Sequence, residues 1–65
     1  MSKATTKFAI AFAFKELLLE KSIDKITIND ITEKCGINRQ TFYYHFHDMY
    51  ELIEWICETD ADHVL

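Results

Sequence analysis

Hydrophobic residues recur at helical spacing over residues 5–21, the first long patterned stretch of the chain. The apolar positions that follow the i, i+3, i+4, i+7, i+8 series are Ile10, Ala13, Phe14, Leu17 and Leu18. Such a series places its members on one face of an α-helix. The pattern therefore predicts a helix that buries this face in a core.

A second apolar stripe lies on the opposite side of the same predicted helix. It consists of Phe8, Phe12 and Leu19, which at about 100° per residue point nearly half a turn away from the first stripe. A three-helix domain cannot bury both faces of its first helix. Either Phe8 frays with the helix end and Leu19 packs under a loop, or the second stripe docks against something outside these 65 residues.

Residues 27–46 predict two short helices joined by a tight turn, which is the layout of a helix-turn-helix. Thr27 is the expected N-cap of the first of these helices, with Asp30 as a weaker capping-box partner. Gly36, the single glycine of the chain, stands where this helix must end and a left-handed backbone residue is needed. In the short connection before the motif, Ile23 and Ile26 are expected to anchor in the core.

The second helix of the motif, over residues 39–46, combines an apolar face with many hydrogen-bonding groups. Asn38 is its expected N-cap, and Phe42 and Phe46 stay apolar at i and i+4. Its polar side chains are Arg39, Gln40, Thr41, Tyr43, Tyr44 and His45. In DNA-binding helix-turn-helix proteins the second helix enters the major groove, so these side chains are candidates for contacts with DNA.

Arg39 and Gln40 have the chemistry needed to read base pairs directly. Arginine can donate two parallel hydrogen bonds to guanine O6 and N7, and glutamine pairs with adenine N6 and N7 in the same way. Both residues stand at the helix start, which enters the groove first. The alternative for them is a solvated surface without a ligand. For Tyr43 and Tyr44 the alternative is ordinary packing, and Tyr43 is expected to be the more packed of the two.

A further helix is predicted from Met49 onwards, where Asp48 and Glu51 form another capping-box pattern. Its apolar face would carry Met49, Leu52, Ile53 and Ile56. The residues expected outside this face are Tyr50, Trp55 and Cys57. The predicted fold class is therefore all-α, a three-helix bundle with a homeodomain-like helix-turn-helix and the start of a fourth helix.

Composition indicates one small packed domain, because the chain has 65 residues and 49% of them are hydrophobic. No apolar run approaches the roughly 18 residues of a membrane span, and no signal-peptide pattern is present, so we expect a cytoplasmic protein. Cys35 and Cys57 lack metal-binding spacing. Both are expected to be reduced, with Cys35 in the core.

The sequence offers no constellation typical of an enzyme or of a metal site. His45 and His47 are two residues apart, and on a helix that spacing points their rings in different directions. The chain contains no glycine-rich phosphate loop and no nucleophile at an informative distance from a base. A chain of this size also cannot enclose a substrate pocket of several hundred Å³. We therefore expect no catalysis, no metal and no cofactor.

The net charge of −4 is unusual for a DNA-binding domain, but the acidic residues are concentrated in one segment. Residues 1–26 carry five lysines against three acids, and residues 27–47 are neutral. Residues 48–65 carry six acids and no lysine or arginine. The candidate recognition helix, residues 39–46, contains no acid. Since lysine and arginine supply most of the attraction to phosphate, one copy of this domain should bind DNA weakly.

The run GINRQTFYYHFHDMYEL, together with the first helix and the TINDI segment, resembles the N-terminal DNA-binding domain of the tetracycline-repressor (TetR) family of bacterial regulators. The resemblance covers about residues 8–57. Within the family, the aromatic recognition helix and the acidic ELIEWI segment are most similar to the regulators of dihydroxyacetone-kinase operons.

The resemblance assigns contacts with DNA to individual residues. Those that would face bases are Arg39, Gln40 and Tyr44. Those that would face the phosphate backbone are Thr27, Asn38, Thr41, Tyr43 and His45. Asn29 takes a place that is often arginine and would reach a phosphate or a base edge. His47 and Met49 stand where basic residues are usual, which weakens the electrostatic attraction to DNA, and His47 is retained as a candidate contact.

The resemblance also implies the domain organisation and the partners. Residues 1–47 would form the DNA-binding domain, and residues 48–65 the fourth helix that leads to a C-terminal effector and dimerisation domain absent from this chain. The expected partners are a palindromic double-stranded operator, a second copy of the protein, and a small-molecule or protein effector bound outside this chain, with no membrane. The alternative is a protein-interaction module that acts through the acidic fourth helix and the second apolar stripe, without strong DNA binding.

Overall fold

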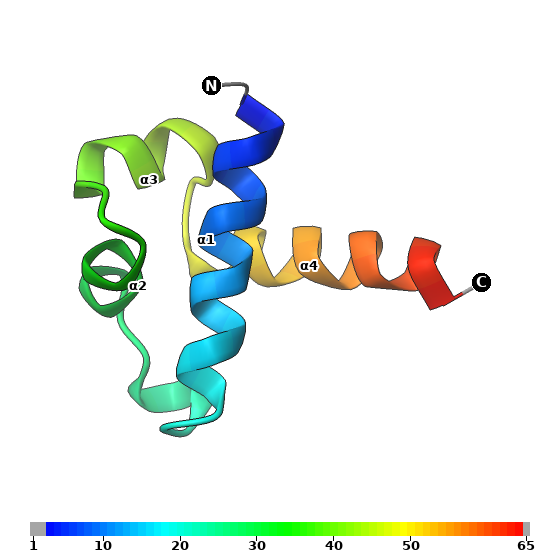
Figure 1. The fold of residues 1–65 in the computed structure, drawn as a ribbon, viewed down its shortest axis with the longest axis horizontal. Coiled ribbons are helices and arrows are strands. Elements are labelled where there is room, and N and C mark those ends of the chain that lie inside the picture. The colour runs from blue at the N-terminus through cyan, green and yellow to red at the C-terminus, as the bar shows by residue number, and fades with distance from the viewer. Residues whose placement is uncertain (1–2, 65) are drawn as a thin grey trace.

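Residues 3–64 fold into four α-helices and one short 3-10 helix, shown in Figure 1. The computed structural model describes residues 3–64, with side chains over residues 5–59. The helices are α1 (Lys3–Leu18), η1 (Ile23–Lys25), α2 (Ile28–Cys35), α3 (Arg39–His45) and α4 (Met49–Val64). The predicted all-α fold is confirmed, and Leu65 at the end of the predicted fourth helix lies outside the described residues.

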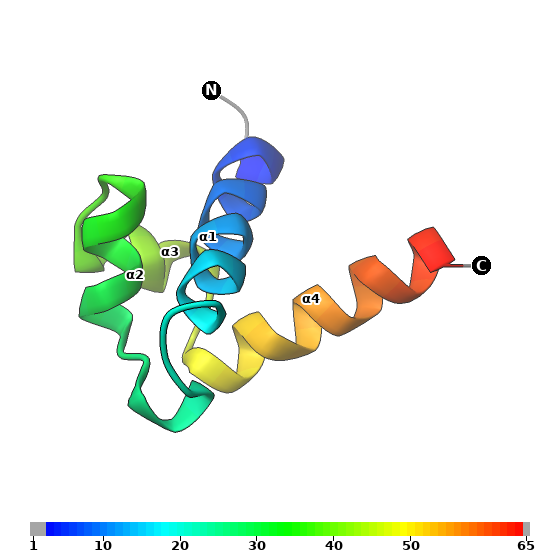
Figure 2. The ribbon, with the colours of Figure 1, turned by 60° about the horizontal axis from the view of Figure 1, so that its bottom comes forward.

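α1, α2 and α3 form a bundle from which α4 departs. α1 runs through the middle of the molecule with α2 and α3 on one side of it, and it contacts both. α4 starts beside α1 and points away from α2 and α3 in both views (Figures 1 and 2). The two halves of the helix-turn-helix therefore share one side of the molecule, and the far end of α4 lies on another.

One hydrophobic core connects all four α-helices. Its largest fully buried side chains are Phe42, Phe46, Ile10, Ile31 and Leu52. The side chains predicted from the first stripe of α1 are buried except for Leu18, and Ala11 joins them. Because α3 has only seven residues, it is too short to be stable alone. The burial of Phe42, and of Phe46 at the C-cap of α3, therefore holds α3 in place.

The predicted capping residues occupy the ends of the helices. The Thr27 hydroxyl accepts a hydrogen bond from the Asp30 N–H at 3.1 Å, and the Asp30 carboxylate accepts one from the Thr27 N–H at 3.0 Å. Gly36 adopts the left-handed conformation with φ 75° and ends α2. The Asp48 carboxylate accepts a hydrogen bond from the Glu51 N–H at 2.9 Å at the start of α4. The capping box of α2, its glycine C-cap and the Asp48 N-cap of α4 are confirmed.

Two residues predicted to lie in the core are instead at the surface. Leu18 is 42% exposed because α1 ends there, and the N–H groups of Glu20 and Lys21 both fold back onto the Leu17 carbonyl at 2.9 and 3.0 Å. The helix predicted to reach residue 21 therefore ends three residues earlier, at Leu18. Ile23 is 52% exposed at the start of η1, whereas Ile26 is buried as predicted.

The second apolar stripe of α1 is exposed, as its position opposite the core requires, with Leu19 87% exposed and not packed under a loop. Phe8 lies inside α1 and does not fray. Its ring packs edge-on against Trp55, with the ring centroids 5.1 Å apart, and Trp55 also contacts Phe46 at 5.8 Å. The prediction that Trp55 lies outside the packed face of α4 is therefore wrong, because the rings of α1 and α3 reach it.

Candidate nucleic-acid interface

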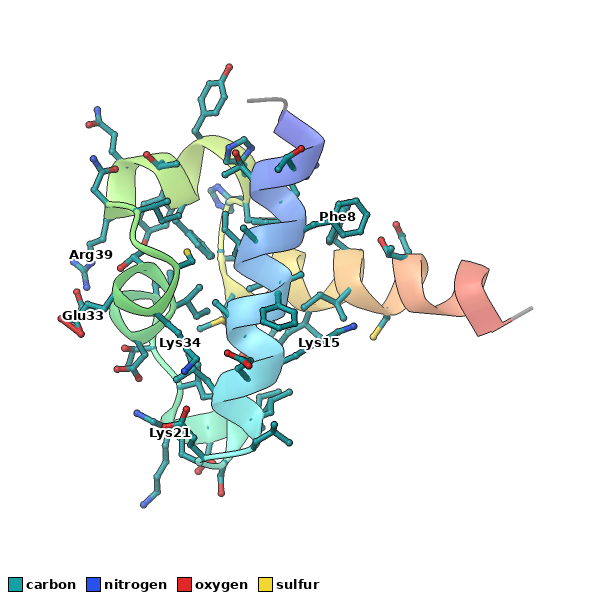
Figure 3. All side chains as sticks on the ribbon, in the orientation of Figure 1. Phe8, Lys15, Lys21, Glu33, Lys34 and Arg39 are labelled. Carbon is teal, nitrogen blue, oxygen red and sulfur yellow. The ribbon has the colours of Figure 1, made fainter. Side chains whose placement is uncertain are left out.

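α3 presents a polar outer face because its apolar side chains are fixed in the core. Arg39, Gln40, Tyr43 and Tyr44 are exposed, and Thr41 and His45 are half-buried. Figure 3 shows the Arg39 side chain pointing outward, away from α1 and α4. Since α3 contains no acid, this face offers hydrogen-bond donors without a competing negative charge.

The N-terminal end of α3 is held by a compact hydrogen-bond arrangement around Asn38. The Asn38 side-chain oxygen accepts one bond from the Thr41 N–H at 2.8 Å and another from the Thr41 hydroxyl at 2.9 Å. Asn38 is thereby confirmed as the N-cap. The single hydroxyl proton of Thr41 is used inside the protein in this arrangement, whereas the bonds to the Asn38 oxygen leave the two amide protons of that side chain for an external acceptor.

The two tyrosines of α3 differ in their surroundings. Tyr43 is 50% exposed and packs edge-on against the buried Phe42 ring, with the centroids 5.6 Å apart. Tyr44 is 67% exposed, and its ring packs edge-on against that of His45 with the centroids 5.2 Å apart. The prediction that Tyr43 is the more packed of the two is confirmed. Tyr44 also lines a shallow surface depression together with Asn38, Gln40 and Thr41, so the fold brings these four predicted contact residues together.

α2 contributes two exposed polar residues at its start, Thr27 and Asn29. The Thr27 hydroxyl accepts the Asp30 N–H, and this bond does not use the hydroxyl proton. The pKa of the Asp30 carboxyl lies below its ordinary value, chiefly because the Thr27 backbone N–H donates a hydrogen bond to it. A smaller part of the shift comes from the Lys21 ammonium, whose nitrogen lies 3.1 Å from an Asp30 carboxylate oxygen. Asp30 therefore stays ionised and keeps the α2 N-terminus fixed.

Arginine and lysine are sparse near α3. Arg39 is the one lysine or arginine of α3. The Lys34 ammonium lies 3.1 Å from a Glu20 carboxylate oxygen and 3.9 Å from one of Glu16, so it links α2 to the end of α1. The exposed acids of α4, Glu51, Glu54 and Glu58, lie on the helix that points away from α3. The polar face of α3 is thus separated from the acidic segment.

His45 is half-buried in the last turn of α3, and His47 is exposed after the helix ends. Within the described side chains, no group of three or more histidine, cysteine or carboxylate residues could hold a metal ion. Over residues 3–64, no helix combines the length and the apolar character that a membrane span requires.

A second surface lies between α1, α4 and the C-terminal end of α2. It is a groove of about 700 Å³ whose apolar lining includes Phe8, Phe12, Trp55 and Ile56. Cys35 also reaches this groove, and burial raises the pKa of its thiol. Cys35 is half-buried beside the core instead of fully inside it. Both Cys35 and Cys57 are free thiols, as predicted.

Sequence reasoning did not single out Lys7, which lies 39 positions before Phe46 in the chain. The Lys7 ammonium nitrogen is 5.5 Å from the centroid of the Phe46 ring and 5.8 Å from that of Trp55. No local spacing signals this contact, because it exists only once α1, α3 and α4 are packed together.

Comparisons with known proteins agree with this arrangement. A family model described as bacterial regulatory proteins of the tetR family matches residues 13–56. The chain is 42% identical over 55 residues to the HTH-type dhaKLM operon transcriptional activator DhaS of Lactococcus lactis, a match covering 85% of this chain and 29% of that protein. It is 30% identical over 53 residues to the HTH-type transcriptional repressor BepR of Brucella suis, covering 82% of this chain and 25% of that protein.

A third relative is the uncharacterized HTH-type transcriptional regulator YvdT of Bacillus subtilis, which is 40% identical over 50 residues, 77% of this chain and 26% of that protein. The chain thus spans less than a third of the length of these relatives. All three are named as transcriptional regulators, which indicates a regulatory family and not an enzymatic one. The chain belongs to the TetR family of bacterial regulatory proteins, and its helix-turn-helix is the N-terminal DNA-binding domain of that family.

Proposed function

We propose that this domain binds a specific DNA sequence by inserting α3 into the major groove. The observation that carries the proposal is the start of α3, where Arg39 and Gln40 are exposed beside the Asn38 cap on a helix without acids. A recognition helix contacts base edges mainly through its N-terminal residues. Arg39 would bind guanine and Gln40 adenine, and each good pair contributes about 1–3 kcal/mol of discrimination against the wrong base.

The remaining polar residues would fix the position of α3 on the duplex. Tyr44 is one turn beyond Gln40 and would face the bases beside it. In this proposal the Asn38 amide protons bind a phosphate, and the other residues that contact phosphates are Thr27, Tyr43, His45 and His47. Thr41 would also contact a phosphate, by exchanging its hydroxyl bond to Asn38 for one to the phosphate. Asn29 would reach a phosphate or a base edge. Such contacts set orientation and affinity without carrying sequence information.

The proposed regulator acts in the cytoplasm as a homodimer on a palindromic operator. Residues 1–47 would form the DNA-binding domain, and α4 would lead to the effector and dimerisation domain. This fits a chain that matches at most about three tenths of the relatives' length. Two copies would place two α3 helices in major grooves about 34 Å apart, or a multiple of that distance.

The test is a selection of random duplex DNA by two copies of the chain joined by a flexible linker, at several salt concentrations. We expect a palindromic consensus, and we expect Arg39→Ala to lose one defined base preference. Lys15→Ala removes a positive charge from the side of α1 that faces the groove, and should leave the consensus unchanged. Phosphate attraction is strong at about 50 mM salt, so an absence of consensus or of binding there would contradict the proposal.

The α1–α4 groove supports a second candidate function, that of a protein-interaction module. Phe8 and Phe12 are 50% and 63% exposed along it, which is unusual for large apolar side chains on one surface. If the selection returns no consensus, substitution of Phe12 by Asp and measurement of partner binding would test this function next.

A further inference from the structure

We infer that Lys7 of α1 binds a DNA phosphate beside the C-terminal end of α3. This inference rests on the proposed function and adds to it a phosphate contact from outside the helix-turn-helix. The reason lies in where the fold places the Lys7 ammonium and in the lack of lysine and arginine after Arg39.

The Lys7 ammonium lies at the junction of three helices. Its nitrogen is 5.5 Å from the centroid of Phe46, the C-cap of α3, and 5.8 Å from that of Trp55 in α4. α3 contacts α1 and ends beside it in both views (Figures 1 and 2). Since Lys7 is half-buried, its methylene stem can pack on the rings while the charged end stays at the surface.

A lysine or arginine beside the C-terminal end of α3 must come from before residue 40. Residues 40–65 contain no lysine or arginine. Lys34 and Lys21 are already placed against carboxylates, at 3.1 Å from Glu20 and Asp30 respectively. A helix in the major groove has a phosphate backbone on each side, with the groove about 12 Å wide. In the proposed complex Thr27 and Asn38 would contact one backbone, and Lys7, whose ammonium lies by the ring of the C-cap Phe46, would contact the other.

Contact with aromatic rings leaves the positive charge of a lysine available to bind a phosphate. The faces of Phe46 and Trp55 attract the ammonium through their quadrupoles. Unlike a carboxylate, a ring does not neutralise the charge, so the ammonium can still release a counterion from DNA when it meets a phosphate. The rings also restrict the side chain before binding, which lowers the entropy lost on contact.

The experiment measures how the affinity of the 65-residue chain for a duplex with one selected half-site depends on salt, by fluorescence anisotropy between 20 and 100 mM NaCl. Lys7→Met keeps the apolar stem and removes the charge. Lys15→Met, on the same helix, is the matched control, and Lys7→Arg keeps the charge at the junction.

We expect Lys7→Met to reduce the slope of log affinity against log salt by about 0.9, the value for one phosphate contact. Cognate and random duplexes should weaken by the same factor, because a phosphate contact is blind to sequence. Lys15→Met and Lys7→Arg should keep the wild-type slope. Circular dichroism melting checks that the variants are folded, and Lys7→Gln provides the same comparison if the methionine variant does not fold.

An unchanged slope in folded Lys7→Met, with Arg39→Ala still losing its base preference, would overturn this inference and leave the proposed function intact. If two linked copies of the wild-type chain bound no duplex at about 50 mM salt, both the proposed function and this inference would be overturned. A loss of affinity confined to the cognate duplex would mean that Lys7 positions α3 instead of holding a phosphate, and would also overturn the inference.

Discussion

α3 and α4 begin with the same kind of N-cap, but their exposed side chains differ in charge. Each begins at a side-chain oxygen, that of Asn38 or Asp48, which accepts a backbone N–H at 2.8 or 2.9 Å. Each inserts one fully buried residue into the core, Phe42 or Leu52. Outside these positions α3 carries donors and no acid, whereas α4 carries exposed acids.

The difference indicates a division of roles between two helices that share one core. A phosphate backbone would be attracted to α3 and repelled by α4, and α4 points away from α3 (Figure 1). The acidity that makes the whole chain negative therefore does not argue against DNA binding. Net charge describes the chain, while binding depends on the charge near the contact surface.

The largest expected effect comes from removing the core residue that holds α3. Phe42→Ala should cost about 3–5 kcal/mol. A domain of this size has a total stability of several kcal/mol, at roughly 0.05–0.15 kcal/mol per residue. We expect the variant to be mostly unfolded at 25 °C by circular dichroism, and Leu52→Ala to show that α4 is equally dependent on the core.

Tyr43→Ala is the matched control for Phe42→Ala, because it removes the neighbouring ring, which is 50% exposed. It should melt within several degrees of the wild type. If Phe42→Ala melted there too, α3 would not depend on the core as described.

A smaller effect separates the two helix starts from each other. Asn38→Ala and Asp48→Ala each remove an N-cap oxygen and should each lower stability by about 1 kcal/mol. In thermal melts this corresponds to roughly 4–8 °C for a domain of this size. Only Asn38→Ala should also weaken DNA binding in the anisotropy assay. Equal losses of DNA binding in both variants would erase the distinction between α3 and α4.

The smallest expected effect concerns acid and the start of α2. The Thr27 N–H and the Lys21 ammonium lower the pKa of Asp30 in the folded chain, so this carboxylate stabilises the fold above its unfolded pKa. The contribution is lost as the pH falls below the ordinary pKa of an aspartate and through the lowered pKa of Asp30. Melting temperatures from pH 6 to pH 2.5 should fall less steeply for Asp30→Asn than for the wild type, and parallel curves would contradict this account.

The parts of the fold that local chemistry decides could be predicted from the sequence. Thr27, Gly36 and Asn38 occupy the predicted ends of helices because capping depends on residues within one turn. The i and i+4 spacing of Phe42 and Phe46 likewise identified the buried side of α3, and thereby which of its residues are exposed. The exposed candidates on α3 agree with the prediction, although their contacts with DNA stay predictions.

The features that depend on distant partners could not be predicted. Trp55 reads as a surface residue on α4 alone, and its packing requires Phe8 of α1 and Phe46 after α3. Leu18 has the periodicity of a core residue, but the helix ends before another element covers it. The contacts of Lys7 likewise arise from the packing of three helices.

The way α3 is attached has a consequence for evolution. Phe42 is its one fully buried residue, and the exposed positions 39, 40, 43 and 44 face outward. Substitutions at such surface positions usually change stability by no more than about 0.5 kcal/mol. If α3 reads DNA as proposed, a lineage could exchange these side chains, and with them the preferred DNA sequence, without first acquiring compensating mutations in the core. Under the proposed function, folding and target choice would be inherited through separate sets of residues within the same seven-residue helix.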